Sequence, residues 1–334
     1  MESTTVNKEN VHKVLHAIFD ACEEVATAIR DVDCAVGVEQ NNVFGDNQLH
    51  IDVLADKHIF DHLKKTGLVN FACSEETPEP HYCGGKEFIV TFDPLDGSSI
   101  IDVNWTVGTI FAIWPNKNDL QGLTGHDIIT SGIVIYGPRT SVVYYDLEDG
   151  KVNEYKLHYK DEKMPESTWV KMKTGLQIKP TTKICAPGNF RALSESKAYI
   201  EAFDYWRKNK YVLRYIGGMA PDCYAIFIKS GGIFAALTSK SCPPKLRLLY
   251  ECQPIGFIIE KAGGKTTDGE KSVLDIVING YQQKTTFACG SSEEIDRINK
   301  LWAAEQAELK RQAAEAKTDE KTEEKTEVKT EVKA

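Results

Sequence analysis

Apolar residues recur at helical spacing near the beginning of the chain and then give way to short apolar runs. Between residues 7 and 30 they fall at i, i+3, i+4 and i+7, which predicts an amphipathic helix. Residues 51–66 repeat that pattern up to Gly67 and predict a second helix. Short apolar runs between turn residues then predict a series of strands, several buried on both faces, at 68–73, 87–92, 106–114, 132–137 and 140–146.

The second half of the chain alternates strands and helices. Residues 150–180 alternate weakly and predict surface strands and loops, and strands are then expected at 183–186, 212–215 and 232–237. Helices are expected at 194–208, 221–229 and 245–262, the last of them closed by Gly263-Gly264. Elements of both kinds in both halves predict a layered protein of mixed α and β structure.

The division into domains follows from the same pattern. We expect one domain over residues 1–180, a second over 181–300 and a charged tail over 301–334. The tail begins as a predicted helix and ends in a four-residue repeat of Lys, Thr and Glu or Val without an apolar stripe. We therefore expect its end to be disordered and solvated, with no part in catalysis.

Composition and charge narrow the class of partner. The 334 residues carry 40 Lys+Arg against 49 Asp+Glu, a net charge of −9, which argues against a nucleic-acid or anionic-membrane surface. No apolar run approaches the ~20 residues that a membrane-spanning helix needs, and no targeting segment is visible. The nine cysteines contain no C-x-x-C pair and predict free thiols. We expect a cytoplasmic protein.

The most informative motif is the octet FDPLDGSS at residues 92–99, directly behind the predicted buried strand 87–92. Asp93 and Asp96 leave the same strand end, and Gly97 allows a sharp turn. The N–H groups around Ser98 and Ser99 are expected to begin a helix, whose N-terminus attracts anions. A lone D-x-x-D is more often a helix-capping turn, but two carboxylates beside such a cradle predict a Mg²⁺-dependent phosphate site.

Further acidic residues are placed to join this site. Glu75 and Glu76 follow the strand 68–73, and strand ends in one sheet converge. Glu251 lies in an otherwise apolar helical stretch, where a carboxylate needs a partner such as a metal. Asp46 and Asp52 flank a polar loop. On their own, Glu75 and Glu76 would more often be a surface charge pair.

Several motifs together resemble the fructose-1,6-bisphosphatase/sedoheptulose-1,7-bisphosphatase family over residues 10–300. These are FDPLDGSS, SEE at 74–76, RYIGGM at 214–219 and KLRLLYE at 245–251. The resemblance implies a five-layer αβαβα sandwich of the sugar phosphatase type, with Mg²⁺ as cofactor and Mn²⁺ as its alternative. It also implies a homodimer or homotetramer in which Arg214 reaches the neighbouring subunit's site.

The same resemblance implies roles for individual residues. Glu76 and Asp52 would act on the attacking water, and Asp46 would lie on a mobile loop that closes over the site. The metals would be held by Glu75, Asp93, Asp96, Glu251 and the carbonyl of Leu95. The sugar bisphosphate would be bound by Asp96, Gly97, Ser98, Ser99, Asn189, Arg191, Arg214, Tyr215, Met219 and Lys245.

Three departures from the family pattern bear on control and specificity. Glu87 and Phe88 stand where fructose enzymes have a Lys-Tyr pair for AMP. Gln40 stands where chloroplast sedoheptulose enzymes have one of two redox-active cysteines, and Cys34 is the candidate for the other. We therefore expect neither AMP control nor that redox switch. Two tyrosines of the fructose enzymes' distal-phosphate pocket correspond to Ala192 and Ala236.

The sequence thus predicts hydrolysis of the 1-phosphate of sedoheptulose 1,7-bisphosphate to sedoheptulose 7-phosphate and phosphate. A roomier distal end, left by the two alanines, favours the seven-carbon sugar. Fructose-1,6-bisphosphatase activity, or dual specificity, is the alternative within the class. An inactive sugar-phosphate-binding scaffold is the alternative from a different class, and the intact set of acids disfavours it.

Overall fold

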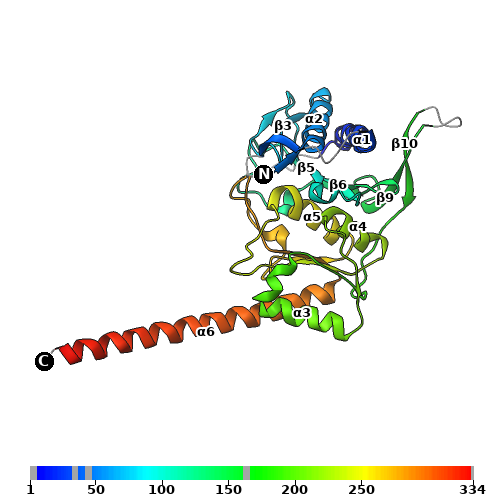
Figure 1. The fold of residues 1–334 in the computed structure, drawn as a ribbon. Helices are drawn as coiled ribbons and strands as arrows, with labels where there is room; N and C mark the ends of the chain where they lie inside the picture. Colours follow the sequence, from blue (N-terminus) through cyan, green and yellow to red (C-terminus); the bar gives the residue numbers. More distant parts are fainter. Residues whose placement is uncertain (1–5, 32–36, 42–46, 161–165, 332–334) are drawn as a thin grey trace.

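Five layers of helices and sheets make up the fold of the chain. The structure, a computed structural model, describes residues 6–31, 37–41, 47–160 and 166–331. From one side to the other the layers are two helices, a large sheet, two helices, a small sheet and two helices (Figure 1). The predicted mixed α/β sandwich is therefore confirmed.

Six α-helices lie in pairs in the three helical layers. The outer pair on the large sheet is α1 (Lys8–Asp31) and α2 (His50–Lys65). The middle pair is α4 (Met219–Ile228) and α5 (Gln253–Lys261). The pair on the far face of the small sheet is α3 (Lys197–Lys208) and α6 (Ser292–Glu331). The count of six refers to the ranges that the structure describes.

The large sheet has eight strands in the order β10-β9-β8-β7-β6-β5-β3-β4. Only β3 and β5 pair in parallel among its described strands, and every other pair is antiparallel. The bounds are β3 (Val69–Ser74), β4 (His81–Tyr82), β5 (Phe88–Asp96), β6 (Val107–Pro115), β7 (Thr130–Tyr136), β8 (Thr140–Asp146), β9 (Lys151–His158) and β10 (Thr168–Lys173).

The small sheet has five strands in the order β12-β11-β13-β15-β14. Its first three strands are parallel, and its last two pairings are antiparallel. The bounds are β11 (Ile184–Pro187), β12 (Val212–Leu213), β13 (Ile233–Ala236), β14 (Lys265–Thr267) and β15 (Phe287–Gly290). A separate antiparallel pair is formed by β1 (Gly37–Asn41) and β2 (Asn47–Leu49).

Alternating side chains of β13 show how the small sheet is covered on both faces. Ile233 and Ala235 pack with α3 and α6, whereas Phe234 and Ala236 pack with the middle helices. This alternation follows from the two-residue period of a strand. Because helices cover both faces, the run is apolar at every position.

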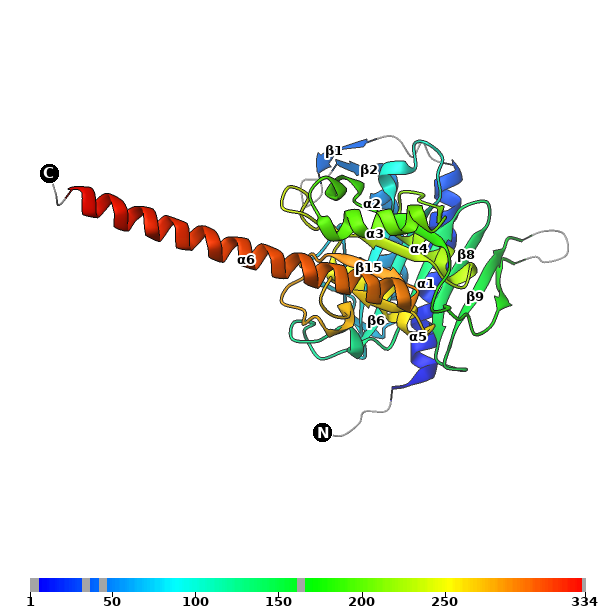
Figure 2. The ribbon, with the colours of Figure 1, turned by 90° about the horizontal axis from the view of Figure 1, so that it is seen from below.

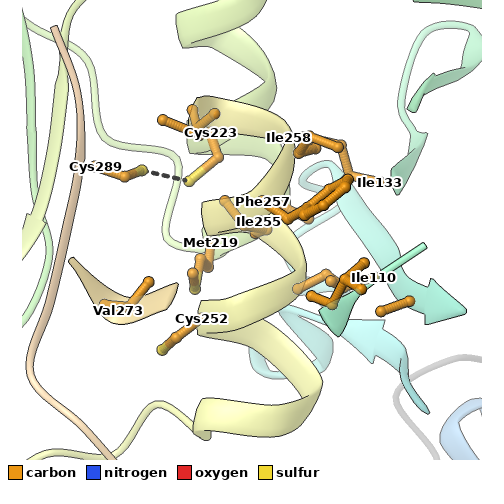
Figure 3. Packing of buried hydrophobic residues seen from close by; sticks show 14 of the residues in the cluster. Ile110, Ile133, Met219, Cys223, Cys252, Ile255, Phe257, Ile258, Val273 and Cys289 are labelled. Atoms are coloured by element: carbon orange, nitrogen blue, oxygen red, sulfur yellow. Dashed lines mark hydrogen bonds between the residues drawn. The ribbon is translucent and has the colours of Figure 1, made fainter. Parts of the chain in front are cut away.

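The middle layer is the largest core and joins the two sheets. Figure 3 shows Met219 and Cys223 of α4 packed beside α5, between strands of the large sheet and Cys289 of the small sheet. The sulfur atoms of Cys223 and Cys289 lie 3.6 Å apart as free thiols. Gly108 of β6 allows the close approach of α4, since a Cβ there would lie 2.9 Å from the Cβ of Ala220. The position of α4 is thus fixed against the large sheet.

The structure corrects four predicted boundaries. β5 does not end before the two aspartates but runs through Asp96. The helix expected at Ser98 is a 3₁₀ turn over Ser98–Ile100, too short for a helix dipole to attract an anion. The helix expected from Lys245 begins as a π-helical turn at Leu248. β12 covers only the first two residues of the strand expected at 212–215.

The last helix projects far beyond the layers. α6 packs on the small sheet at its start and continues to Glu331 without further support from the body (Figures 1 and 2). The four-residue repeat is therefore helical in the structure as far as Glu331, rather than disordered. No helix in the described part of the chain is long and apolar enough to cross a membrane. The proposed domain boundaries stay predictions.

Candidate active site

Two strand ends of the large sheet bring the first carboxylates together. β3 and β5 run in parallel, with Ser74 paired to Phe92. Residues that follow these positions therefore leave the same edge of the sheet. The N–H of Glu75 donates to the carbonyl of Phe92 at 3.1 Å, which places Glu75 beside Asp93. The predicted convergence of strand ends is confirmed for this pair.

A bulge in β5 turns both aspartates of the octet to one side. Asp93 pairs with Ile110 of β6, and Asp96 pairs with Gly108. Between these two pairs, β5 therefore contains one more residue than β6. On a regular strand, residues three apart point to opposite faces. The extra residue of a bulge reverses that relation. The N–H of Leu95 donates to Asp93 Oδ1 at 3.0 Å and holds the local shape.

Glu251 reaches the aspartates from the π-helical turn Leu248–Cys252. One ligand atom each from Asp93, Asp96 and Glu251 lies within 4.8 Å of the others, and all three residues are buried. A π-turn is a widened helical turn that is frequent at functional sites. The carboxylate of Glu251 accepts the backbone N–H of Arg247 at 2.6 Å.

Arg247 is a charged residue of this site that the sequence analysis did not assign. Its guanidinium forms an ion pair with Glu75, and the arginine is almost fully buried. It therefore links Glu75 to the backbone turn that carries Glu251. Its position in KLRLLYE is the sign of this role in the sequence. A charged residue among apolar residues needs a partner, and this holds for Arg247 as it does for Glu251.

The three clustered carboxyls hold their protons unusually strongly. Burial, followed by repulsion from Glu75 and the other acids, raises the pKa of Asp93 well above its ordinary value. Burial likewise raises the pKa of Asp96 to about 7, against hydrogen bonds from the backbone of Ala220. The pKa of Glu251 is raised by burial and by Glu75 and Asp96. A divalent cation would offset this repulsion, so the donor set fits a metal of the hard, oxygen-binding kind.

For the other residues with a predicted role in catalysis or metal binding, the structure gives the burial of three and does not describe the fourth. Asp52 is buried in the first turn of α2, and Glu76 is partly buried next to Glu75. Asp46 lies outside the described residues. Leu95, whose carbonyl was assigned to a metal, is buried between the two aspartates. The roles of these residues stay predictions.

A cleft of about 400 Å³ opens beside the carboxylates. Asp96 lines this cleft and also belongs to the acid cluster, so the two features form one site. The N–H of Ala220, at the start of α4, donates to Asp96 Oδ2 at 2.7 Å. Of the predicted substrate residues, eight line the cleft: Asp96, Gly97, Ser99, Asn189, Arg191, Tyr215, Met219 and Lys245. Ser98 and Arg214 are not among the lining residues.

The cleft also carries positive charge. Arg191 and Lys245 are exposed there, and two hydroxyl residues that the sequence analysis missed, Thr238 and Thr285, also line the wall. Ala236 lines the cleft as predicted. Ala192 does not, because its side chain is fully buried in the layer beneath, against α3. Of the two alanines, only Ala236 therefore leaves space in the cleft.

Asp222 shapes the segment that enters the cleft before α4. Its two carboxylate oxygens accept the N–H groups of Ile216, at 2.8 Å, and Gly217, at 3.2 Å. Gly217 has φ of 107°, a conformation that favours glycine. The turn fixes Tyr215 on the cleft wall. The sequence offered only the spacing of RYIGGM as a sign of it.

The structure describes only some of the residues that bear on the predicted absence of regulation. Glu87 is exposed, and its two oxygens accept the side-chain amide of Asn10 on α1 at 2.9 and 2.8 Å. Cys34 lies outside the described residues, and of Gln40 only the backbone, within β1, is described. The absence of AMP control and of the two-cysteine switch stays a prediction.

Comparisons with known proteins agree with this architecture. Residues 2–163 match the family described as fructose-1-6-bisphosphatase, N-terminal domain, and residues 178–303 match its C-terminal domain. The chain belongs to the fructose-1,6-bisphosphatase family. It is therefore a sugar bisphosphatase, a hydrolase of phosphoric monoesters.

Relatives of this sugar bisphosphatase include enzymes named for sedoheptulose 1,7-bisphosphate and enzymes named for fructose 1,6-bisphosphate. It is 42% identical over 291 residues to the chloroplastic sedoheptulose-1,7-bisphosphatase of Spinacia oleracea, covering 86% of this chain and 73% of the relative. It is 36% identical over 300 residues to the class 1 fructose-1,6-bisphosphatase of Trichlorobacter lovleyi, covering 87% and 90%. The crystal structure of Leishmania major fructose-1,6-bisphosphatase in holo form is similar with a TM-score of 0.80 at 26% identity, over 89% of this chain and 95% of that one.

We predict that the metal-free bisphosphatase loses stability as the pH rises. Its clustered carboxyls keep protons in the fold that the unfolded chain releases at a pH of about 4. Stability present below that pH is therefore lost as the pH rises through the folded pKa, which for Asp96 is about 7. In the presence of a metal chelator, the melting temperature should fall as the pH is raised from about 5 to about 8.

The matched variants are Asp96→Asn and Asp102→Asn, the second at an exposed position close by. Asp96→Asn should flatten the pH dependence and raise the melting temperature at the alkaline end, whereas Asp102→Asn should leave both unchanged. An unaltered slope in Asp96→Asn would contradict this account.

Proposed function

We propose that this enzyme hydrolyses the 1-phosphate of sedoheptulose 1,7-bisphosphate in a Mg²⁺-dependent reaction. The observation that carries the proposal is the position of Asp96, which joins the buried acid cluster to a cleft that Arg191 and Lys245 also line. One phosphate bound through a metal at the acids and a second phosphate bound at Arg191 and Lys245 would account for both groups of charges. The similarity to enzymes named for the seven-carbon sugar supports the choice of substrate.

The acid cluster accounts for the metal requirement. Asp93, Asp96 and Glu251 would hold Mg²⁺, with Glu75 and the Leu95 carbonyl completing the set and Mn²⁺ as the alternative ion. Carboxylate and carbonyl oxygens are the ligands that Mg²⁺ prefers. When bound, Mg²⁺ supplies positive charge against the negative charge that grows on the phosphate in the transition state.

The protein's own groups would supply the remaining chemistry. Glu76, with Asp52, would accept a proton from the water whose oxygen attacks phosphorus, while the bond from phosphorus to the sugar oxygen breaks. Arg191 and Lys245 would orient the sugar through its distal phosphate, Arg by paired N–H donors and Lys as a point charge. This division separates the binding groups from the proton acceptor.

Replacing the proton acceptor tests the mechanism. Glu76→Gln should keep metal and substrate binding and lower kcat at least about 100-fold, since it removes a base and not a metal ligand. Phosphate release should be measured with and without Mg²⁺, with Glu79→Gln as the control on an exposed neighbouring acid. Near-normal kcat in Glu76→Gln would refute its role. Wild-type protein that binds sugar phosphate without Mg²⁺-dependent release would instead favour the scaffold alternative.

The position of Ala236 supports the proposed preference for the seven-carbon sugar. The reacting phosphate would be held by the metal at the carboxylates, so an additional carbon must extend the distal phosphate farther from the acids. The small side chain of Ala236 on the cleft wall leaves room for that extension. Because a roomy cleft still admits a smaller ligand, we expect only a modest preference over fructose 1,6-bisphosphate.

A bulky residue at this position should reverse the preference. Ala236→Tyr should shift the ratio of kcat/KM for the seven-carbon over the six-carbon bisphosphate by about tenfold toward the six-carbon sugar. Ala236→Phe separates bulk from the phenol hydroxyl. Both substrates should be measured side by side on the same preparations. A ratio unchanged by either variant would remove the argument from space.

We further propose a homodimer or homotetramer in which Arg214 serves the neighbouring site. Arg214 does not line its own cleft. Around it, Val212, Leu213 and Tyr215 are large apolar or aromatic residues that are about half exposed or more. Such clustered exposure is typical of an interaction surface. A second copy would cover it and receive Arg214.

Mixed subunits test the sharing of Arg214. A chain with Arg214→Ala and a chain with Asp93→Asn, each inactive alone, should regain about a quarter of wild-type activity when co-expressed, because one site of each heterodimer is then complete. Arg207→Ala, at an exposed position on α3, replaces Arg214→Ala in the control and should be active alone. Absence of recovery in purified heterodimers would show that the arginine acts within its own chain.

A further inference from the structure

Glu75 and Glu76 are the two central residues of a closed turn. The N–H of Ser74 donates to the carbonyl of Thr77 at 2.9 Å, and the N–H of Thr77 donates back to Ser74 Oγ at 2.8 Å. Both ends of the four-residue segment are thereby joined. The direction of both carboxylates depends on how this turn is held against the rest of the protein.

Asp56 of α2 holds both ends of that turn. The hydroxyl of Ser74 donates to Asp56 Oδ1 at 2.5 Å, and the hydroxyl of Thr77 donates to Asp56 Oδ2 at 3.1 Å. Hydrogen bonds to a carboxylate are shorter and stronger than those between neutral groups. Because Ser74 Oγ also accepts the N–H of Thr77, the serine hydroxyl connects the carboxylate to the turn's own closure.

Asp56 also relates the turn to another predicted catalytic residue. Asp52 lies four residues earlier on the same helix, and residues four apart lie on one helical face. α2 therefore presents Asp52 and Asp56 toward the large sheet together. The two hydrogen bonds that Asp56 accepts connect the first turns of α2, which carry Asp52, to the Glu75-Glu76 turn after β3.

We propose that Asp56 is a positioning residue that fixes the Glu75-Glu76 turn relative to Asp52 and thereby sets metal affinity and kcat without touching metal or substrate. The inference rests on the proposed Mg²⁺-dependent hydrolysis and adds to it a residue that neither the motif nor the acid cluster includes. Partners that orient a metal ligand or a base from outside typically affect metal affinity or activity by about 10- to 100-fold when removed.

The sequence context explains why Asp56 was not recognised. It lies within an ordinary amphipathic helix, in the segment ADKHIF, and belongs to no motif. In the motif SEE, Ser74 is marked by the sequence only as the residue before two acids. The pairing of both hydroxyls with one carboxylate arises from the packing of α2 against β3 and is visible only in the folded chain.

The experiment measures metal binding separately from turnover. Mg²⁺ and Mn²⁺ binding by the full chain is followed by calorimetry without substrate, and kcat, KM and the Mg²⁺ midpoint are followed by phosphate release. Asp56→Ala should weaken metal binding and lower kcat about tenfold, with KM for the bisphosphate nearly unchanged. Asp56→Asn, which still offers one oxygen acceptor and one amide donor to the two hydroxyls, should recover most of both losses.

Two further variants make the test specific. Asp61→Ala, on the exposed side of α2 where Asp61 pairs with Lys57, should equal wild type in every measurement. Thr77→Val removes one of the two hydrogen bonds at constant size and should raise the Mg²⁺ midpoint about threefold. Thr77→Val keeps the proposal testable even where Asp56→Ala does not fold.

Two results would overturn the proposal. The first is wild-type metal affinity and kcat in Asp56→Ala with only a lower melting temperature, which would assign Asp56 to stability alone. The second is wild-type metal binding in Thr77→Val. Failure of the proposed function is a different result, namely no Mg²⁺-dependent phosphate release by wild type from either sugar bisphosphate, and calorimetry still decides the role of Asp56 in that case.

Discussion

Mutual repulsion among buried carboxylates is the constraint on which the site depends. Asp93, Asp96 and Glu251 are brought within 4.8 Å of one another in an interior that raises the pKa of each. Such an arrangement is unfavourable for folding by itself, because each ionised carboxylate loses water and gains like-charged neighbours. It persists because three rigid elements hold it: the bulge of β5, the π-turn before α5 and the start of α4, which donates an N–H to Asp96.

The packing of the layers holds the clustered acids in place despite their repulsion. α4 and α5 are enclosed between two sheets, and their apolar side chains fill the largest core (Figure 3). A close-packed interior resists small displacements, so the ends of both helices are held against the edge of the large sheet. The charged groups therefore lie at a boundary between two well-packed units. The cleft forms there because Asp96 and the start of α4 face residues of the small sheet across it.

Arg247 and Asp56 are two charged residues outside the octet FDPLDGSS that affect the same acids. Arg247 offsets negative charge directly through Glu75 and fixes the turn of Glu251 through its backbone. Asp56 adds a further negative charge nearby, where burial raises its pKa to about 6 against hydrogen bonds from Ser74 and Thr77. The two hydrogen bonds that Asp56 accepts offset part of the cost of burying its charge.

The sequence by itself determined the layered α/β class, most of the helices and strands, and the acids of the site, because apolar periodicity and motif spacing are local properties of the chain. It could not place the bulge between Asp93 and Asp96, the π-turn at Glu251 or the buried position of Ala192, since each depends on a neighbouring strand or helix. Only the tertiary structure decided which charges meet, as with Arg247 and Glu75, 172 residues apart in the chain. Hydrogen bonds and ion pairs act over a few ångströms in space. The number of residues between two positions in the chain does not reveal how far apart they lie in the folded protein.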